Sequence, residues 1–155
     1  MAISKQKIKQ QYEAALPELL EPGERVLAST LSLTGPSPWL AGGLLGMATG
    51  QRNYYVVVTD RRVLFMKGTV STGKPQGLAW ADPRGAATVH DVDIENKVWS
   101  KFRYQPPGGK DIRFNIHRLW RDEGAAVVAA MMTHATSTQT PETAPVQPGT
   151  GTSRQ

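Results

Sequence analysis

The sequence contains no cysteine, which excludes disulfides, thiolate metal sites and cysteine nucleophiles from its chemistry. A chain without cysteine is more typical of the cytoplasm than of a small secreted protein. The lysines of the first residues, MAISKQKIKQQ, are not followed by an apolar stretch, so this start lacks the pattern of a signal peptide. We therefore expect a cytoplasmic protein.

Charge is also missing from one long stretch, because no charged residue occurs between Arg25 and Arg52. The apolar part of this gap, residues 38–48, is eleven residues long and contains three glycines. A membrane-spanning helix needs roughly 20 consecutive apolar residues, and serines, threonines and prolines interrupt the gap before residue 38. The sequence therefore predicts a strand followed by an apolar loop, and not a transmembrane helix.

The charges that are present are unevenly placed along the chain. The formal net charge is +5, and residues 51–121 hold thirteen basic side chains against six acidic ones. This middle segment is the best candidate for a surface that faces an anion or a charged partner, although ordinary solvated charge explains the excess equally well. The candidate basic residues are Arg52, Arg61, Arg62, Lys67, Lys101, Arg103 and Arg113.

Hydrophobic periodicity predicts a helix, about seven strands and a second helix. Ile8, Tyr12 and Leu16 recur at helical spacing, and Pro17 should break the helix after about Ala15. Alternating or β-branched segments predict strands at residues 24–34, 53–59, 62–68, 78–81, 88–94, 98–104 and 111–117, with residues 68–77 as a loop. Short strands joined by tight turns imply an antiparallel sandwich or barrel.

The second helix is predicted at residues 118–133, with an apolar side that includes Leu119, Val127 and Met131. A terminal helix of this kind can close the open end of a barrel. Past residue 134 the chain is rich in threonine, proline and glycine, which predicts disorder. The expected organisation is a helical extension at residues 1–20, a domain at 21–134 and a disordered tail at 135–155.

The segments at residues 88–94 and 98–104 both place their apolar residues at even positions. Val92 and Val98 are therefore expected to face the core. This parity requires a loop of odd length between the two strands, most simply residues 95–97, and it places Asp91 opposite Lys101 across the ladder.

Two segments resemble the bacterial pleckstrin-homology-like (PH-like) domains and the related GRAM-type domains. They are LLEPGERVLAS at residues 19–29 and YYVVVTDRRVLFMKG at residues 54–68. The resemblance extends over roughly residues 16–134. It implies a mainly β (α+β) fold, in which a strongly bent, seven-stranded antiparallel barrel is capped by a C-terminal helix; the predicted N-terminal helix precedes it.

The Thr59-Asp60-Arg61-Arg62 motif within this resemblance is interpreted as structural. Asp60 can accept hydrogen bonds from backbone N–H groups two residues on and so hold a tight turn, with Arg61 or Arg62 offsetting its charge. In many eukaryotic relatives the preceding loop binds phosphorylated lipid headgroups through Lys and Arg. Here that loop contains no basic residue before Arg52, so this specificity does not transfer.

The leading functional hypothesis is a non-catalytic binding or assembly module that contacts a protein partner or a second copy through the apolar loop. The residues expected to make that contact are Trp39, Leu40, Leu44, Leu45 and Met47. The main alternative is reversible attachment of the same loop to an anionic membrane surface, because several partly buried apolar side chains supply a few kcal/mol. It would place the protein on the inner face of the membrane.

Other chemistries find less support in the sequence. Asp91, Asp93 and Glu95 begin like a calcium loop, but Asn96 stands where that loop needs glycine. The three histidines are too scattered for a metal site, and no nucleophile-elbow motif is present. We expect no enzyme activity, no metal and no cofactor. Weak nucleic-acid binding through Trp99, Lys101 and Arg103 remains a third hypothesis.

Overall fold

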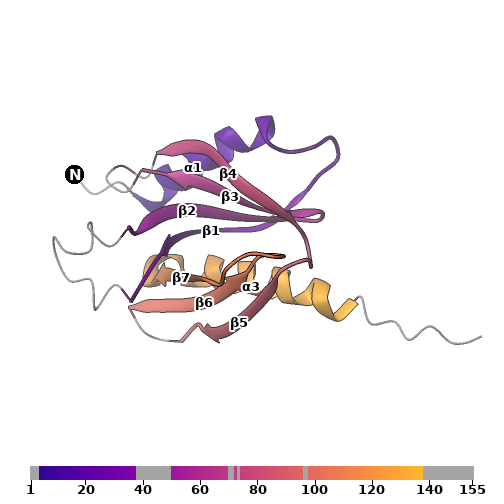
Figure 1. The fold of residues 1–155 in the computed structure, drawn as a ribbon. Coiled ribbons are helices and arrows are strands. Elements are labelled where there is room, and N and C mark those ends of the chain that lie inside the picture. The colour runs from indigo at the N-terminus through magenta and orange to yellow at the C-terminus, as the bar shows by residue number, and fades with distance from the viewer. Residues whose placement is uncertain (1–3, 38–49, 70–71, 73, 96–97, 138–155) are drawn as a thin grey trace, which may run out of the picture.

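The protein is mainly β, with one seven-stranded antiparallel sheet and a helix near each end (Figure 1). The computed structural model describes residues 4–37, 50–69, 72, 74–95 and 98–137. The elements are α1 (Lys5–Ala15), η1 (Leu16–Glu18), β1 (Val26–Thr34), β2 (Arg52–Thr59), β3 (Arg62–Gly68), β4 (Pro75–Pro83), β5 (Thr88–Asp93), β6 (Trp99–Gln105), β7 (Ile112–His117), η2 (Arg118–Trp120) and α3 (Arg121–Ser137). This confirms the predicted fold class.

The sheet has the strand order β4-β3-β2-β1-β7-β6-β5. In Figure 1, β1–β4 form one layer and β5–β7 form a second, and the sheet bends between β1 and β7. These two strands pair only at Leu33 with Asn115 and at Thr34 with Phe114. The short pairing joins the two layers at one end and allows them to diverge from there.

Aromatic side chains fill the space between the two layers. Phe65 of β3 stacks on Trp80 of β4 with ring centroids 4.1 Å apart, and its ring lies 5.5 Å from that of Phe114 on β7. Phe114 also stacks on Phe102 of β6 at 5.2 Å. Since these rings come from both layers, the bend of the sheet is stabilised by the core that it encloses.

Helix α1 covers part of the opposite face of the β1–β4 layer and contacts β2, β3 and β4. Tyr12 stacks on Tyr55 of β2 with ring centroids 4.3 Å apart, and both side chains are fully buried. Ser4 caps the helix, because its Oγ accepts a hydrogen bond from the Lys7 N–H. The helix ends before Pro17, as predicted, and it explains why β2 and β3 are buried on both faces.

Helix α3 packs into the core through Val127, Val128 and Met131. Gly124 permits this approach, since a Cβ there would lie 2.6 Å from Cδ1 of Ile116 on β7. The prediction that Leu119 belongs to the buried side was wrong. Leu119 is 59% exposed, because it lies in η2 ahead of the helix, where its neighbour Trp120 is buried instead.

The predicted β5–β6 register was also wrong. A bulge follows His90, and Asp91 adopts a positive φ of 49°. Lys101 consequently lies opposite Asp93, although its Nζ does donate to Asp91 Oδ2 at 3.0 Å. Val92 is 41% exposed and Val98 36%, so neither faces the core as expected. Part of the predicted loop, residues 96–97, lies outside the described residues.

The β2–β3 turn has the structural role that the sequence predicts but different hydrogen-bond acceptors. Thr59 Oγ1 accepts from the backbone N–H groups of Arg61 and Arg62, at 3.1 and 2.9 Å. Asp60 Oδ1 instead accepts from the Arg25 N–H at 2.9 Å. The turn is thereby tied to the start of β1.

Both arginines of this turn pair with glutamates of the preceding Pro-Gly-Glu turn and not with Asp60. Arg62 Nη2 lies 2.7 Å from Oε2 of the buried Glu24, and Arg61 lies 3.3 Å from Glu21. The hydrogen bond from Arg62 is the main reason why the pKa of Glu24 falls from 4.5 to about 2. The two segments that carry the family resemblance therefore contact each other.

Strand β4 begins at Pro75, inside the segment predicted as a loop. No helix among the described residues is long and apolar enough to cross a membrane.

Candidate functional site

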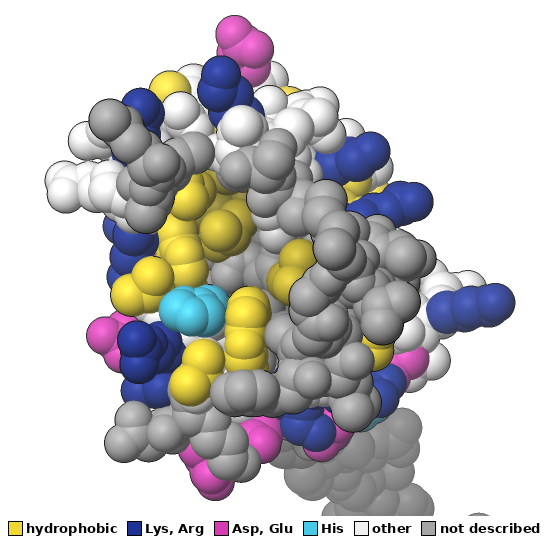
Figure 2. Space-filling view, turned by 90° about the vertical axis from the view of Figure 1, so that its left-hand side faces the viewer, with side chains coloured by type: hydrophobic (Ala, Val, Ile, Leu, Met, Phe, Trp, Pro, Cys, Tyr) yellow, Lys and Arg dark blue, Asp and Glu magenta, His cyan; other side chains and the backbone are white. Residues whose placement is uncertain are grey.

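A pocket of about 180 Å³ opens at the end of the sheet where β1 and β7 diverge. Eight residues from β1, β2, β6, β7 and η2 line it: Leu31, Ser32, Leu33, Asn53, Trp99, Asn115, His117 and Trp120. We call it the Trp99 pocket. Figure 2 shows this end of the molecule, where hydrophobic side chains gather around a histidine and Lys and Arg side chains lie beside them.

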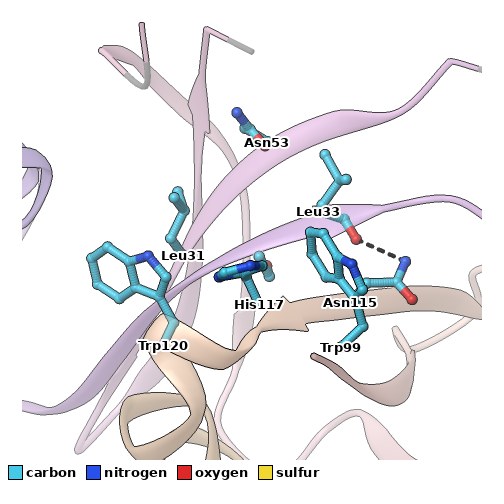
Figure 3. A pocket seen from close by; sticks show the side chains of 8 residues that line it. Leu31, Leu33, Asn53, Trp99, Asn115, His117 and Trp120 are labelled. Carbon is cyan, nitrogen blue, oxygen red and sulfur yellow. Dashed lines mark hydrogen bonds between the residues drawn. The ribbon is translucent and has the colours of Figure 1, made fainter. Parts of the chain in front are cut away.

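The pocket exists because a strand pairing stops. Continued register from Leu33 and Asn115 would place Leu31 opposite His117, but the pairing of β1 with β7 does not extend that far. Figure 3 shows His117 between two groups of side chains, with Leu31 and Trp120 on one side and Leu33 and Trp99 on the other. The two strands part here and leave a hollow between them.

Alternation along β6 and β7 directs Trp99 and His117 to the same side of the sheet. The two residues are paired across the strands, and their rings meet edge to face with centroids 5.0 Å apart. The adjacent positions, Ser100 and Ile116, are buried. Trp99 and His117 are only half-buried, so one aromatic wall of the pocket is accessible to a ligand.

Asn115 holds the end of β1 in place. Its Nδ2 donates to the backbone oxygens of Leu33 at 3.2 Å and Gly35 at 3.0 Å, while its Oδ1 accepts from Nε of Arg113 at 3.0 Å. These bonds fix the orientation of the amide. Asn115 is therefore a positioning residue that sets the distance between β1 and β7.

The hydrogen bond to the ring of His117 determines the tautomer of its neutral form. Its Nδ1 accepts from the backbone N–H of Leu119 at 3.3 Å, which caps η2. Burial, followed by the charge of Arg118, lowers the pKa of His117 below its usual value. A neutral ring whose Nδ1 is an acceptor carries its proton on Nε2. His117 can therefore donate one hydrogen bond from Nε2.

Trp120 forms the other aromatic wall. Its ring meets Tyr55 edge to face at 6.1 Å, and the Nζ of Lys5 lies 5.3 Å from its ring centroid. Lys5 also forms an ion pair with Glu123 of α3 at 2.5 Å. Helix α1 thus supports the side of the pocket that Trp120 forms.

The basic residues that the sequence singles out do not form one patch. Arg61 and Arg62 pair with glutamates at the β2–β3 turn. Lys101 and Arg103 pair with Asp91 and Asp111 on the outer face of β5–β7, at distances of 3.0 and 2.8 Å. The remaining three are Arg52 and Lys67, which are exposed, and Arg113, which donates to Asn115.

The apolar residues predicted to contact a partner lie outside the described residues. They are Trp39, Leu40, Leu44, Leu45 and Met47, within the segment 38–49. In the described strands before and after this segment, Leu33 of β1 and Asn53 of β2 line the Trp99 pocket. The role of the segment stays a prediction.

Sequence patterns point to part of the pocket without revealing it. Trp99 stands out for its basic neighbours, and His117 stands out only as one of three scattered histidines. Asn115 and Trp120 carry no signal of their own. The available signal is the alternation Trp99-x-Lys101-x-Arg103 on β6 beside Arg113-x-Asn115-x-His117 on β7, which places six polar or aromatic side chains on one face.

No protein-family model and no curated protein matches this chain. Among solved structures, it is similar to the C-terminal domain of an unknown protein from Leishmania infantum, with a TM-score of 0.49 and 10% sequence identity. That match covers 81% of this chain and 98% of the other. At this level of similarity the comparison assigns no function.

Proposed function

We propose that this chain is a non-catalytic, PH-like protein-binding module and that the Trp99 pocket is its binding site. The observation that carries the proposal is an open hollow with apolar and aromatic walls and a few polar lining side chains, among them His117, whose ring proton lies on Nε2. Such a combination of apolar lining with a few polar groups is typical of binding sites.

The PH-like assignment is supported by local contacts as well as by the resemblance. The Pro-Gly-Glu turn and the Thr-Asp-Arg-Arg turn are joined by the Glu24–Arg62 pair, in which Thr59 Oγ1 also donates to Glu24 at 2.6 Å. Because these motif residues bond to one another, we assign them a structural role. The binding site is then expected in another part of the sheet.

The lining chemistry favours recognition over catalysis. Among the described residues, no Asp, Glu, Lys or Arg lines the pocket. The Nδ1 of His117 is engaged by a backbone N–H, and no described nucleophile or carboxylate bonds to its ring. The site offers shape, apolar surface and a few polar groups, which suffice to bind a side chain of a partner.

The nucleic-acid hypothesis loses support from the ion pairs. Lys101 and Arg103, the cations it depends on, already contact Asp91 and Asp111. Phosphate groups would have to displace these carboxylates.

The proposal is tested by selecting binding peptides from a displayed random library and measuring their affinities for purified variants. Trp99→Ala should weaken selected peptides at least about tenfold, since truncating a central aromatic anchor typically costs about 2 kcal/mol or more at a binding hot spot. Leu78→Ala, at an exposed apolar side chain on β4, should leave affinities unchanged. Peptide affinities that Trp99→Ala leaves unchanged would overturn the proposal.

The sequence-based hypothesis for residues 38–49 has a separate test. If this segment makes contact with a partner, a second copy or a membrane, then Leu44→Asp with Leu45→Asp should reduce peptide binding, self-association by light scattering, or sedimentation with phosphatidylglycerol vesicles. Sedimentation of the unmodified protein with vesicles, lost in the double variant, would favour the membrane alternative over protein contact.

A further inference from the structure

We infer that the partner of the Trp99 pocket is an acidic protein segment that inserts one large apolar side chain. This inference rests on the proposed function and specifies its partner. Three features of the described residues carry it: the size of the pocket, its concave shape and the arginines that neighbour its lining residues in sequence.

The size of the pocket fits a single side chain. A cavity of about 150 Å³ accommodates benzene, and the Trp99 pocket has about 180 Å³. Sites for drug-sized molecules are larger, on the order of 300–1,000 Å³. A phenylalanine or leucine side chain therefore fills this hollow, whereas a cofactor or a whole lipid does not.

The shape argues for a protein partner and against insertion of the pocket into a membrane. A surface that enters a bilayer projects apolar side chains outward. Here Leu31 and Trp99 form the walls of a recess, and the backbone around them is fixed by the hydrogen bonds of Asn115. A recess with a fixed rim receives a projecting side chain.

The charged residues that directly neighbour the lining residues in sequence are all positive. Every charged residue adjacent in sequence to a lining residue is an arginine: Arg52, Arg118 and Arg121. Arg52 and Arg118 are exposed, and within the described part of the chain no carboxylate forms an ion pair with either. An acidic segment would supply the missing carboxylates.

Among the other candidate basic residues, four are already paired, whereas Lys67 and Arg113 form no ion pair with the described residues. Arg61, Arg62, Lys101 and Arg103 each have a carboxylate partner within the chain. A second copy docking through the same end would bring Arg52 and Arg118 of both copies together, and like charges repel. The charge pattern therefore favours a different, acidic partner.

The test uses three matched peptides of defined sequence: acetyl-Glu-Asp-Phe-Asp-Glu-amide, its uncharged analogue acetyl-Gln-Asn-Phe-Asn-Gln-amide, and acetyl-Glu-Asp-Ala-Asp-Glu-amide. Binding is followed by the NMR shifts of the Trp99 indole and the His117 imidazole in the full chain. The acidic Phe peptide should bind at least about tenfold more tightly than either analogue, and added salt should reduce its advantage over the uncharged one.

Variants of the arginines test the contribution of charge to peptide affinity separately from the contribution of the pocket. Arg52→Gln with Arg118→Gln should remove the preference for the acidic peptide while Phe binding persists. The control, Arg61→Gln, removes a cation at the far turn and should change nothing.

The outcomes distinguish the two levels of the proposal. Equal affinity of the acidic and uncharged Phe peptides overturns the acidic partner and leaves the pocket as a binding site. No shift of Trp99 or His117 with any peptide overturns both. Shifts produced only by phosphatidylglycerol vesicles also overturn both, in favour of a membrane surface.

Discussion

Gly68, the last residue of β3, makes room for the hydroxyl group of Tyr12 on α1. A Cβ at this position would lie 1.9 Å from the Tyr12 Oη, which is far too close for any side chain. The hydroxyl itself is buried and has no hydrogen-bond partner among the described residues, and burial is the main cause that raises the pKa of Tyr12 to about 12. One glycine therefore determines how closely α1 approaches the sheet.

Gly68→Ala should destabilise the fold by about 1–3 kcal/mol, because the added methyl group overpacks this contact. Tyr12→Phe should cost little or even stabilise, since it removes a buried polar atom without a partner. Urea unfolding of both single variants and the double variant checks this. In the double variant, the ring on α1 no longer presents an oxygen to the added methyl group, so most of the loss should be recovered; strictly additive effects would contradict the proposed contact.

Glu24 is the second residue whose chemistry affects the stability of the whole fold. Its folded pKa of about 2 lies below the ordinary value of 4.5, so its ionised form favours folding. This contribution is complete above about pH 4.5 and is lost as the pH falls toward 2. We expect acid unfolding to begin in that interval.

Glu24→Gln should lower the free energy of unfolding by about 2–3 kcal/mol at neutral pH, because it leaves the Arg62 guanidinium without its carboxylate. It should also flatten the pH dependence between about pH 4.5 and 2. Glu21→Gln, at the exposed pair with Arg61, serves as the control and should cost no more than about 0.5 kcal/mol. Similar losses in the two variants would contradict the special role of Glu24.

The residue types of this turn could be predicted from the sequence, but their partners could not. Threonine and aspartate before a hairpin reversal indicate local hydrogen bonding, and Thr59 does accept from two backbone N–H groups. Asp60 could equally bond forward or to another segment. The donor that Asp60 binds depends on the position of the Arg25 N–H. That position is determined only when the strands pair.

At the scale of elements, α1 has a charge pattern that works against its own helix dipole. Lys5 and Lys7 stand in the first turn, where no acidic residue occurs. Positive charge at a helix N-terminus is unfavourable, and an isolated helix of 11 residues is marginal in water. The helix is therefore maintained by its contacts with the sheet and α3.

Replacement of lysine by glutamate at two positions in the first turn of α1 should have opposite effects on the stability of the fold. Lys7→Glu places a carboxylate three residues after the Ser4 cap, where it completes a capping box and should stabilise by about 0.5 kcal/mol. Lys5→Glu loses the Glu123 ion pair and the contact with Trp120, and should destabilise by about 1 kcal/mol. Thermal unfolding checks both; stabilisation by Lys5→Glu would show that its contacts contribute nothing.

Elements with strong periodicity were predictable, and those with an irregularity were not. Helix α1 and the β2–β3 hairpin follow directly from apolar spacing and turn residues. The predicted β5–β6 register failed because alternation assumes one uninterrupted strand. The observed strand pairs Val89 with Tyr104 before the bulge and Asp93 with Lys101 after it, so no single register holds along its length. A bulge at Asp91 leaves no clear mark in the sequence.

At the scale of the whole molecule, the seven-stranded antiparallel fold was predictable because each strand carries its own local signal. The Trp99 pocket was not, because it is assembled from strands β1, β2, β6 and β7, which are distant in the sequence. Its depth depends on where one strand pairing ends. Neither the end of a pairing nor the space that it leaves is encoded by any single segment.

The first 20 residues are predicted as a helical extension that precedes the domain. In the structure they contribute to the core of that domain. Tyr12 and Leu16 belong to the same buried cluster as Tyr55 and Met66 of the sheet. Full burial of an apolar side chain is worth about 1.5–3 kcal/mol. Removal of both, together with exposure of the sheet residues beneath them, should cost about 5 kcal/mol, which is comparable to the entire stability of many domains.

Deletion of residues 1–20 should therefore abolish cooperative thermal unfolding and collapse the dispersion of the NMR spectrum. The matched deletion of residues 138–155 removes no member of the described core cluster, whose last residue is Met131, and should leave the melting temperature unchanged. The same pair of deletions bears on the binding site, because α1 supports Trp120 through Lys5. If the chain without residues 1–20 unfolds cooperatively at the temperature of the full chain, α1 is an appendage and the buttressing of the Trp99 pocket by this helix is wrong.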